Sequence, residues 1–337
     1  MDPRGAAPTP LSPLEALAQA TGEPLPHLLG AREHTARRVA QARTALGDVT
    51  VDPDVTVVLM GSWGRGELTS GSDDDVLVLA TGDDRPEREI RPAVGELRGA
   101  LRPPAGDQGI FNRAVSVARL ASIGLEADDN TNTTRRLLLL LESASLLGVE
   151  AHRAALAALL DAYLADDRKD RRPPRFLLND VVRYWRTICV DFEGKARGGD
   201  ERKWALRHAK LRTSRAMLFA GGLVPVLECH HVVADDVPRL LLEQFTLPPT
   251  DRLAAAFLAY DAADAGARTF GAYDRFLGLL DDPGARAELE RLGRDEVHAS
   301  AVFQTAKRLG REVQQGLLAL LFEREPLRRL IRQYGVF

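Results

Sequence analysis

A glycine-rich segment between two short apolar runs constrains this chain more than any other feature. The runs 55–60 (VTVVLM) and 76–79 (VLVL) consist mostly of β-branched and aliphatic residues, which is typical of buried strands. Between them lies GSWGRGELTSGSDDD (61–75), in which three glycines occur within six residues. Glycine lets the backbone turn sharply and approach a ligand closely. The sequence therefore predicts two strands joined by a ligand-binding turn.

Three aspartates stand directly before the second run. Because side chains alternate along a strand, we expect Asp73 and Asp75 on one side and Asp74 on the other. Mg2+ is usually held by one or two carboxylates together with phosphate oxygens. Two such ions can clamp the attacking and leaving oxygens of an in-line displacement. Backbone N–H groups from Gly61 onward and the Ser62 hydroxyl would hold the phosphates, so the segment predicts Mg2+ or Mn2+ bound together with an NTP.

The order of these features resembles the signature of the DNA polymerase beta nucleotidyltransferase superfamily: a Gly-Ser turn, a spacer, then Ser-Asp-x-Asp ahead of an apolar strand. Gly-Arg-Gly-Glu (64–67) makes the chain most similar to the protein PII uridylyltransferase type and to the minimal nucleotidyltransferases of bacterial toxin–antitoxin pairs. The resemblance covers about residues 35–150. It implies that Asp73 and Asp75 bind metal, and that Gly61, Ser62 and Arg65 hold phosphates.

The superfamily normally supplies a third carboxylate from a later strand. Asp107 is the candidate, because it comes shortly before a predicted strand at 110–117. It would complete the metal site and favour deprotonation of the attacking hydroxyl. The alternative is that Asp107 is a loop residue. Asp128 and Asp129 compete with it, but the polar residues after them offer helix N-caps, which places both acids at the start of a helix.

A helix is predicted at 135–147, where five consecutive leucines indicate burial. Glu142 lies within it. We interpret this residue as part of an exposed face, with pairing to a basic residue of the site as the alternative.

Helical patterns dominate the rest of the chain, with a tail and short helix at 1–30 and helices at 31–46 and 88–101. The sequence therefore predicts an α+β protein. The resemblance implies that residues 31–148 form a nucleotidyltransferase domain with a small mixed sheet and flanking helices, and a large all-helical domain is predicted at 149–337. Within the second domain the predicted helices are 151–165, 175–193, 201–219, 237–246, 249–264, 268–281, 284–292 and 295–322, with a short one up to Gln333.

The middle of the chain is basic. Residues 168–215 carry 15 Lys and Arg against 6 Asp and Glu, although the whole chain has a net charge of −3. A nucleotide triphosphate or an RNA backbone favours such a surface. Lys203, Arg207 and Lys210 are spaced to share one helix face. Superfamily members commonly place a lysine of the helical domain on the triphosphate, so these three are candidate phosphate ligands. A solvated basic face is the alternative.

Several classes of protein and site are disfavoured. No apolar stretch approaches the roughly 18 residues of a membrane span, and no signal peptide is visible. The two cysteines form no disulfide framework, which indicates a reduced, cytoplasmic protein. Because no membrane span is predicted, we expect no membrane partner. Cys229-His230-His231 lacks a second ligand pair at zinc spacing.

The expected activity is Mg2+-dependent transfer of a nucleoside monophosphate from an NTP to a hydroxyl. The Gly-Arg-Gly-Glu resemblance favours a macromolecular acceptor, protein or tRNA, and a role as a toxin or regulatory modifier. A cyclic-oligonucleotide synthase and an antibiotic nucleotidyltransferase are alternatives. A non-catalytic nucleotide or RNA sensor is a further alternative, disfavoured because the acids and the Gly-Ser turn are intact. No regulatory motif of the PII enzyme follows downstream, so its nitrogen-sensing role is not implied.

Overall fold

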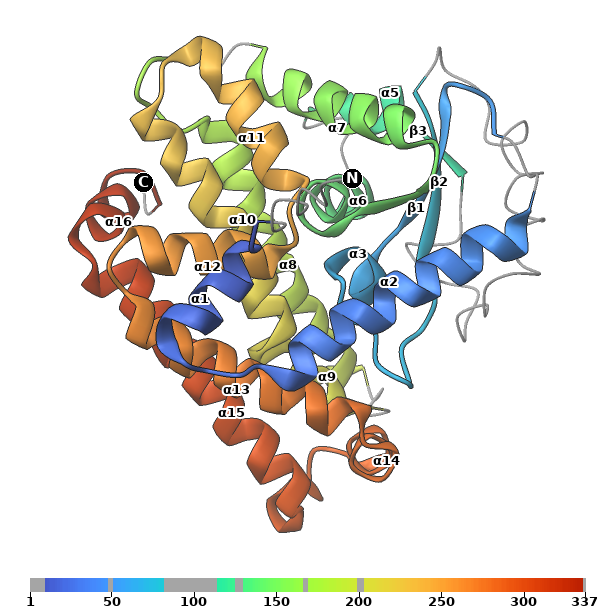
Figure 1. Cartoon of the computed structure of the whole chain (residues 1–337), viewed down its shortest axis with the longest axis vertical. Helices are drawn as coiled ribbons and strands as arrows, with labels where there is room; N and C mark the ends of the chain where they lie inside the picture. Colours follow the sequence, from blue (N-terminus) through green and yellow to red (C-terminus); the bar gives the residue numbers. More distant parts are fainter. Residues whose placement is uncertain are drawn as a thin grey trace, which may run out of the picture.

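A computed structural model describes residues 10–47, 51–81, 114–124, 130–165, 169–198 and 203–335. A small four-stranded mixed sheet lies at one side of the molecule, and helices form the rest (Figure 1). The predicted α+β class is confirmed at this level. Within these ranges no helix combines the length and the apolar composition needed to cross a membrane. The predicted helix at 88–101 and Asp107 lie outside the described residues.

The sheet is built around the two predicted strands. These are β1 (Val55–Leu59) and β2 (Val76–Ala80), which pair antiparallel. β3 (Ala114–Ser116) lies parallel to β2, and β4 (Ala144–Leu147) lies antiparallel to β1, which gives the order β3-β2-β1-β4. β3 falls inside the predicted strand at 110–117.

Alternation along β1 divides the apolar side chains between two cores. Val58 and Met60 belong to the main cluster, whereas Val57 and Leu59 belong to a smaller cluster on the opposite face. The smaller cluster is covered by α2 (Pro26–Leu46), which begins earlier than the predicted helix at 31–46. Because both faces are covered, the strands are apolar throughout rather than alternating.

The predicted helix at 135–147 is wrong at its C-terminal end. Helix α6 (Asn130–Glu142) is followed by β4, whose backbone pairs with β1. The five leucines at 137–141 are all buried, as predicted. The apolar run continues from the helix into the strand, and a short apolar run does not distinguish the two structures. Packing of β4 on the edge of the sheet decides the outcome.

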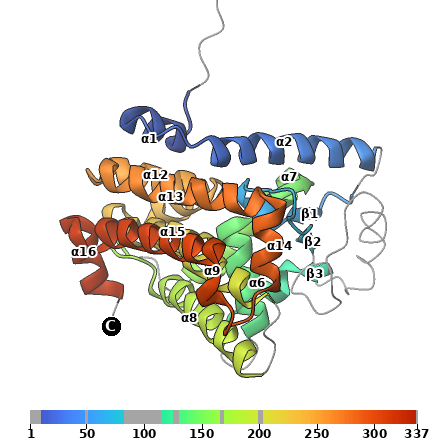
Figure 2. The same cartoon turned by 90° about the horizontal axis from the view of Figure 1, so that it is seen from below.

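Two helices begin the chain and lie along one side of the molecule (Figure 2). α1 (Pro13–Thr21) starts with a capping box, in which Ser12 and Glu15 satisfy each other's backbone N–H groups. The next helix, α2, runs past the sheet, while α7 (Val149–Leu164) packs on β1 and β2.

The region after the sheet is helical, as predicted, but the prediction of a single helix at 201–219 is wrong. It is two helices that meet at the buried Thr213, whose φ of −124° and ψ of −94° interrupt the helical path. The helices are α8 (Arg175–Arg197), α9 (Trp204–Arg212), α10 (Ser214–Glu228), α11 (Val237–Phe245), α12 (Pro249–Ala259), α13 (Ala263–Asp281), α14 (Pro283–Arg291), α15 (Ala301–Leu318) and α16 (Glu325–Leu330).

The main core runs across the predicted domain boundary at residue 148. One connected cluster contains Leu14 of α1, Val58 of β1, Leu139 of α6 and Phe270 of α13. The sheet and the helical region therefore share a hydrophobic core, which fixes the acids of the sheet edge relative to the later helices.

Candidate functional site

The glycine turn is a short helix, α3 (Gly61–Arg65), directly after β1. Gly61 has a φ of +59°, and a Cβ placed on it would lie 2.6 Å from Oδ2 of Asp75. A Cβ on Gly64 would overlap the carbonyl oxygen of Glu142. Both glycines are therefore required by close approach, one to an acid of the site and one to the end of α6.

Asp74 is placed differently from Asp73 and Asp75. Asp74 is buried and accepts a hydrogen bond of 2.9 Å from Nε1 of Trp63. Asp73 is exposed and Asp75 half-buried. Burial raises the pKa of Asp75 to about 7, and the negative charges of Glu142 and Asp73 add to this effect. Asp73 and Asp75 thus act on one another electrostatically, while Asp74 serves the fold.

A buried ion network lies under the turn. Arg65 donates from Nε to Oε2 of Glu67 at 2.7 Å and from Nη1 to Oε2 of Glu142. Tyr273 of α13 donates to the same Glu67 oxygen at 2.7 Å. Although burial alone would lower the pKa of Arg65, the two glutamates hold that pKa well above its ordinary value. The exposed-face interpretation of Glu142 is wrong, and its pairing with a basic residue is observed.

This network bears on the phosphate role predicted for Arg65. Its guanidinium is directed to two carboxylates in the structure. Removing one partner from a buried ion pair typically costs about 3–5 kcal/mol, so these bonds primarily hold the turn together.

Of the three predicted basic ligands, Lys210 is coupled to the acids. Burial lowers the pKa of Lys210 to about 8, Arg286, Arg65 and Arg215 lower it further, and Asp73 opposes them. Lys210 is half-buried on α9, so its ammonium lies within the electrostatic reach of the turn and the acids.

The other two predicted ligands are placed differently. Lys203 is exposed at the N-cap of α9, where its Nζ lies 3.9 Å from Oε2 of Glu290. Arg207 is half-buried one turn later on the same helix.

Sequence reasoning missed four charged or polar groups of this region. Glu67 stood inside the recognised Gly-Arg-Gly-Glu motif, which was a usable signal. Arg215 of α10 acts electrostatically on Glu142 and Lys210, and its place in the basic segment was a weaker signal. Tyr273 and Arg286 come from helices far along the chain and carried no signal.

The donor set suits a divalent cation that arrives with phosphate. Among the described residues, no group of three or more His, Cys, Asp and Glu side chains is arranged to hold a metal. Mg2+ needs only one or two carboxylates when phosphate oxygens supply further ligands. Burial, Glu142 and Asp73 raise the pKa of Asp75 more than Lys210 and Arg65 lower it, and a bound cation would oppose that rise. Asp73 and Asp75 therefore fit the ion, and Asp107 lies beyond the described residues.

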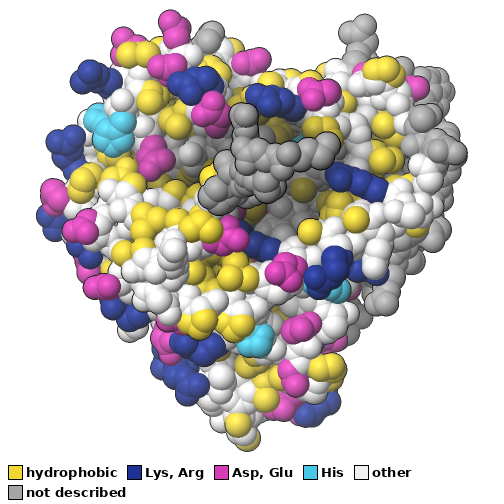
Figure 3. Space-filling view, in the orientation of Figure 1, with side chains coloured by type: hydrophobic (Ala, Val, Ile, Leu, Met, Phe, Trp, Pro, Cys, Tyr) yellow, Lys and Arg dark blue, Asp and Glu magenta, His cyan; other side chains and the backbone are white. Residues whose placement is uncertain are grey.

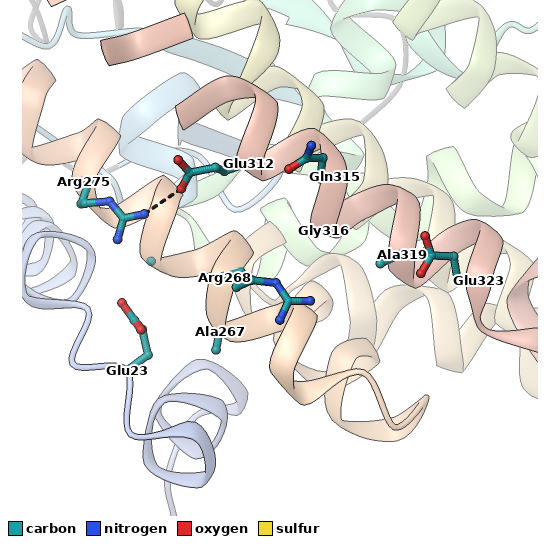
Figure 4. Close-up of a pocket in the computed structure, with 10 residues that line it drawn as sticks. Glu23, Ala267, Arg268, Arg275, Glu312, Gln315, Gly316, Ala319 and Glu323 are labelled. Atoms are coloured by element: carbon teal, nitrogen blue, oxygen red, sulfur yellow. Dashed lines mark hydrogen bonds and ion pairs between the residues drawn. The ribbon is translucent and has the colours of Figure 1, made fainter. Parts of the chain in front are cut away.

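One pocket lies away from the acids and the glycine turn. A pocket of about 470 Å3 lies between α13 and α15, beside the segment that joins α1 to α2 (Figure 4). Its acidic and basic side chains largely offset one another, as in the 2.8 Å pair of Arg275 and Glu312. This mixed-charge pocket contains neither the acids nor the glycine turn.

The described residues on the face in Figure 3 form no patch of a single charge sign. Acidic and basic side chains are interspersed over the face in Figure 3.

No protein-family model and no curated protein matches the chain. The interpretation of the site therefore depends on its geometry and on the motif resemblance.

Proposed function

We propose that this protein is a nucleotidyltransferase that moves a nucleoside monophosphate from an NTP to a hydroxyl of a macromolecular acceptor. The observation that carries the proposal is the grouping of one turn, two acids and one lysine. Asp75 lies against Gly61, Asp73 acts on Asp75, and Lys210 is electrostatically coupled to Asp73. Carboxylates for a metal and a lysine for a polyphosphate thus lie within electrostatic reach of one another, which is the arrangement that phosphoryl transfer uses.

The residues have distinct roles in this proposal. Asp73 and Asp75 would hold Mg2+ or Mn2+, which neutralises charge on the phosphates when bound. The first N–H groups of α3 have no partner within the helix, so Gly61 and Ser62 can donate to phosphate oxygens. Lys210 would bind the triphosphate.

The reaction balances without a further reagent. The acceptor oxygen forms a bond to the α-phosphorus, and the bond from that phosphorus to the bridging oxygen breaks. Pyrophosphate leaves with the bonding electrons, and the hydroxyl proton passes to solvent or to a nearby carboxylate. Most of the acceleration would come from positioning and charge neutralisation.

The acceptor class rests on two supports. The Gly-Arg-Gly-Glu motif resembles enzymes with macromolecular acceptors, and the basic segment includes the exposed Arg186, Lys195 and Arg197 of α8. Both supports fit a protein or a tRNA.

One labelling experiment tests the activity and the acceptor together. The purified protein is incubated with each α-labelled NTP and Mg2+, with and without cell RNA or cell protein. We expect label on a macromolecule and release of pyrophosphate, both abolished in Asp73→Ala and Asp75→Ala variants that remain folded. Label in a small cyclic product would identify a second-messenger synthase instead. Nucleotide binding without turnover under all conditions would identify a sensor.

A further inference from the structure

The loop that carries the acids is attached to helices from the far end of the chain. This acid loop, residues 66–75, leaves α3 and extends toward α14 before it enters β2 (Figure 1). Ser70 lies at its tip, where its N–H donates to Oδ1 of Asp281 at 2.8 Å and its Oγ donates to the carbonyl oxygen of Asp281 at 3.2 Å. Asp281 is the last residue of α13.

A second attachment comes from α14. Nη1 of Arg286 lies 3.5 Å from Oγ1 of Thr69, and a Cβ on Gly71 would overlap the guanidinium. The Arg286 side chain is only 11% exposed, and its Nε pairs with Glu290 at 3.0 Å. The arginine is therefore fixed from its own helix and packs against the loop.

The loop tip is a tight turn that ends at the first acid. Ser72 N–H donates to the carbonyl oxygen of Thr69 at 3.0 Å, and Oγ of Ser72 accepts from Thr69 N–H at 3.0 Å. Asp73 follows immediately. A shift of the turn would therefore move the Asp73 carboxylate with it.

A third attachment lies at the start of the loop, where the buried Tyr273 of α13 donates to Glu67. The acid loop is thus held at its beginning by α13 and by Thr35 of α2, which accepts from Leu68 N–H at 3.0 Å, and at its tip by α13 and α14. Fixing the loop costs backbone entropy, and these contacts offset that cost before any substrate binds.

We propose that the corner between α13 and α14 positions the metal-binding acids, with Asp281 and Arg286 as positioning residues that hold the loop ahead of Asp73. This inference rests on the proposed nucleotidyl transfer. The two residues touch the loop and act on the reaction through Asp73. Arg286 also acts electrostatically on Lys210, so the exchange of the loop without ligand is the readout that isolates positioning. A misplacement of about 1 Å at a reacting centre lowers a rate by about 100-fold, so loosening the loop lowers turnover while leaving the fold intact.

Two variants and two matched controls test the proposal. Asp281→Ala removes the acceptor of the Ser70 N–H, and Arg286→Ala removes the guanidinium over Gly71. Asp264→Ala on α13 and Arg291→Ala on α14 remove exposed charges from the same helices. Hydrogen exchange of peptides covering 66–75 is measured without nucleotide or metal, followed by turnover at varied Mg2+.

We expect exchange at the Ser70 amide to rise at least about tenfold in Asp281→Ala and Arg286→Ala and to stay unchanged in both controls. Turnover falls by about 10- to 100-fold, and the Mg2+ concentration for half-maximal rate rises. Asp281→Asn keeps an oxygen acceptor, so it restores protection and rate.

The positioning role is overturned if loop exchange is unchanged in both alanine variants. It is also overturned if both variants keep the wild-type turnover and the wild-type Mg2+ concentration for half-maximal rate. Exchange is measured without ligand, so it decides the state of the loop even in an inactive protein. An inactive wild type with a protected loop overturns the nucleotidyltransferase proposal itself. Should Asp281→Ala fail to fold, Arg286→Ala and Asp281→Asn carry the same comparison.

Discussion

Burial and the nearby charges of Glu142 and Asp73 raise the pKa of Asp75. Its pKa of about 7, against an ordinary 3.8, means that the folded protein holds this proton more tightly than the unfolded chain. Between these two values the native state binds more protons. The contribution of Asp75 to stability therefore falls as pH rises from about 4 to 7, when no metal is bound.

Asp75→Asn is expected to remove this dependence and to abolish transfer. Without metal, the variant should be more stable than the wild type at pH 8 and similar to it at pH 4, as measured by urea unfolding. Saturating Mg2+ should stabilise only the wild type, by about 2.7 kcal/mol at 100 times its dissociation constant. If the free energy of unfolding changes with pH in the same way in both proteins, burial of the Asp75 charge is not the cause of the pH dependence.

Lys210 makes a separate prediction for the dependence of binding on pH. Its pKa of about 8 means that the ammonium loses its proton at lower pH than an ordinary lysine. A neutral lysine binds phosphate poorly, so KM for the NTP should rise as pH increases above about 8, approaching tenfold per unit. Lys210→Arg should remove the rise up to pH 9.5, because arginine stays charged. The measurement is KM from pH 6.5 to 9.5.

Lys203→Arg is the matched control, since Lys203 is exposed and its Nζ lies 3.9 Å from Oε2 of Glu290. It should keep the wild-type profile. A rise in KM that persists in Lys210→Arg would assign the dependence to another group.

At the scale of elements, the glycine turn offers a paired test. Gly61 and Gly22 both have positive φ, +59° and +72°, but only Gly61 has a neighbour within reach of an added Cβ, the Asp75 carboxylate. Gly61→Ala and Gly22→Ala should each lose about 1–2 kcal/mol of stability from the left-handed backbone. Gly61→Ala alone should also lose transfer, by about 100-fold, because the methyl group displaces Asp75.

Urea denaturation and initial rates check these two outcomes. Equal rates in the two variants would show that the closeness of Gly61 to Asp75 has no part in the reaction.

The elements differ in how far the sequence could predict them. β1 and β2 were predictable because apolar, largely β-branched runs end at glycine, aspartate or threonine. β4 was not, because Ala144–Leu147 continues the apolar run of α6, and only pairing with β1 makes it a strand. The break at Thr213 was hidden for a similar reason, since the helical pattern continues on both sides.

The site shows the same division. The Gly-Ser turn and the aspartates lie within one local motif, so spacing and alternation were enough to single them out as a candidate site. Asp281 reaches Ser70 across 211 positions of sequence, and no local pattern marks either residue. Contacts of this kind are set by how α13 and α14 pack on each other and on α2 and α9, which a single sequence does not display.

At the scale of the whole molecule, buried polar contacts join the regions that the hydrophobic core already connects. Leu14 N–H donates to Asp251 of α12 at 3.0 Å, and Leu28 N–H donates to Asp274 of α13 at 2.8 Å. The buried Arg252 donates to the carbonyl oxygens of Leu141 in α6 and Gly221 in α10. These donors and acceptors lose their partners if either region opens alone, which costs about 1–3 kcal/mol per buried group.

The shared core and these contacts predict that the sheet and the helices unfold together, although chains of this size often unfold in stages. Trp63 is buried beside the sheet, where it donates to Asp74. In a Trp185→Phe, Trp204→Phe variant its fluorescence reports the sheet region alone, while ellipticity at 222 nm reports mainly the helices. We expect the two signals to give the same urea midpoint and slope, because loss of either region exposes the core of the other. A fluorescence midpoint at lower urea than the ellipticity midpoint would mean that the sheet opens first, and that the acids are held less firmly than the packing of α6, α13 and β1 implies.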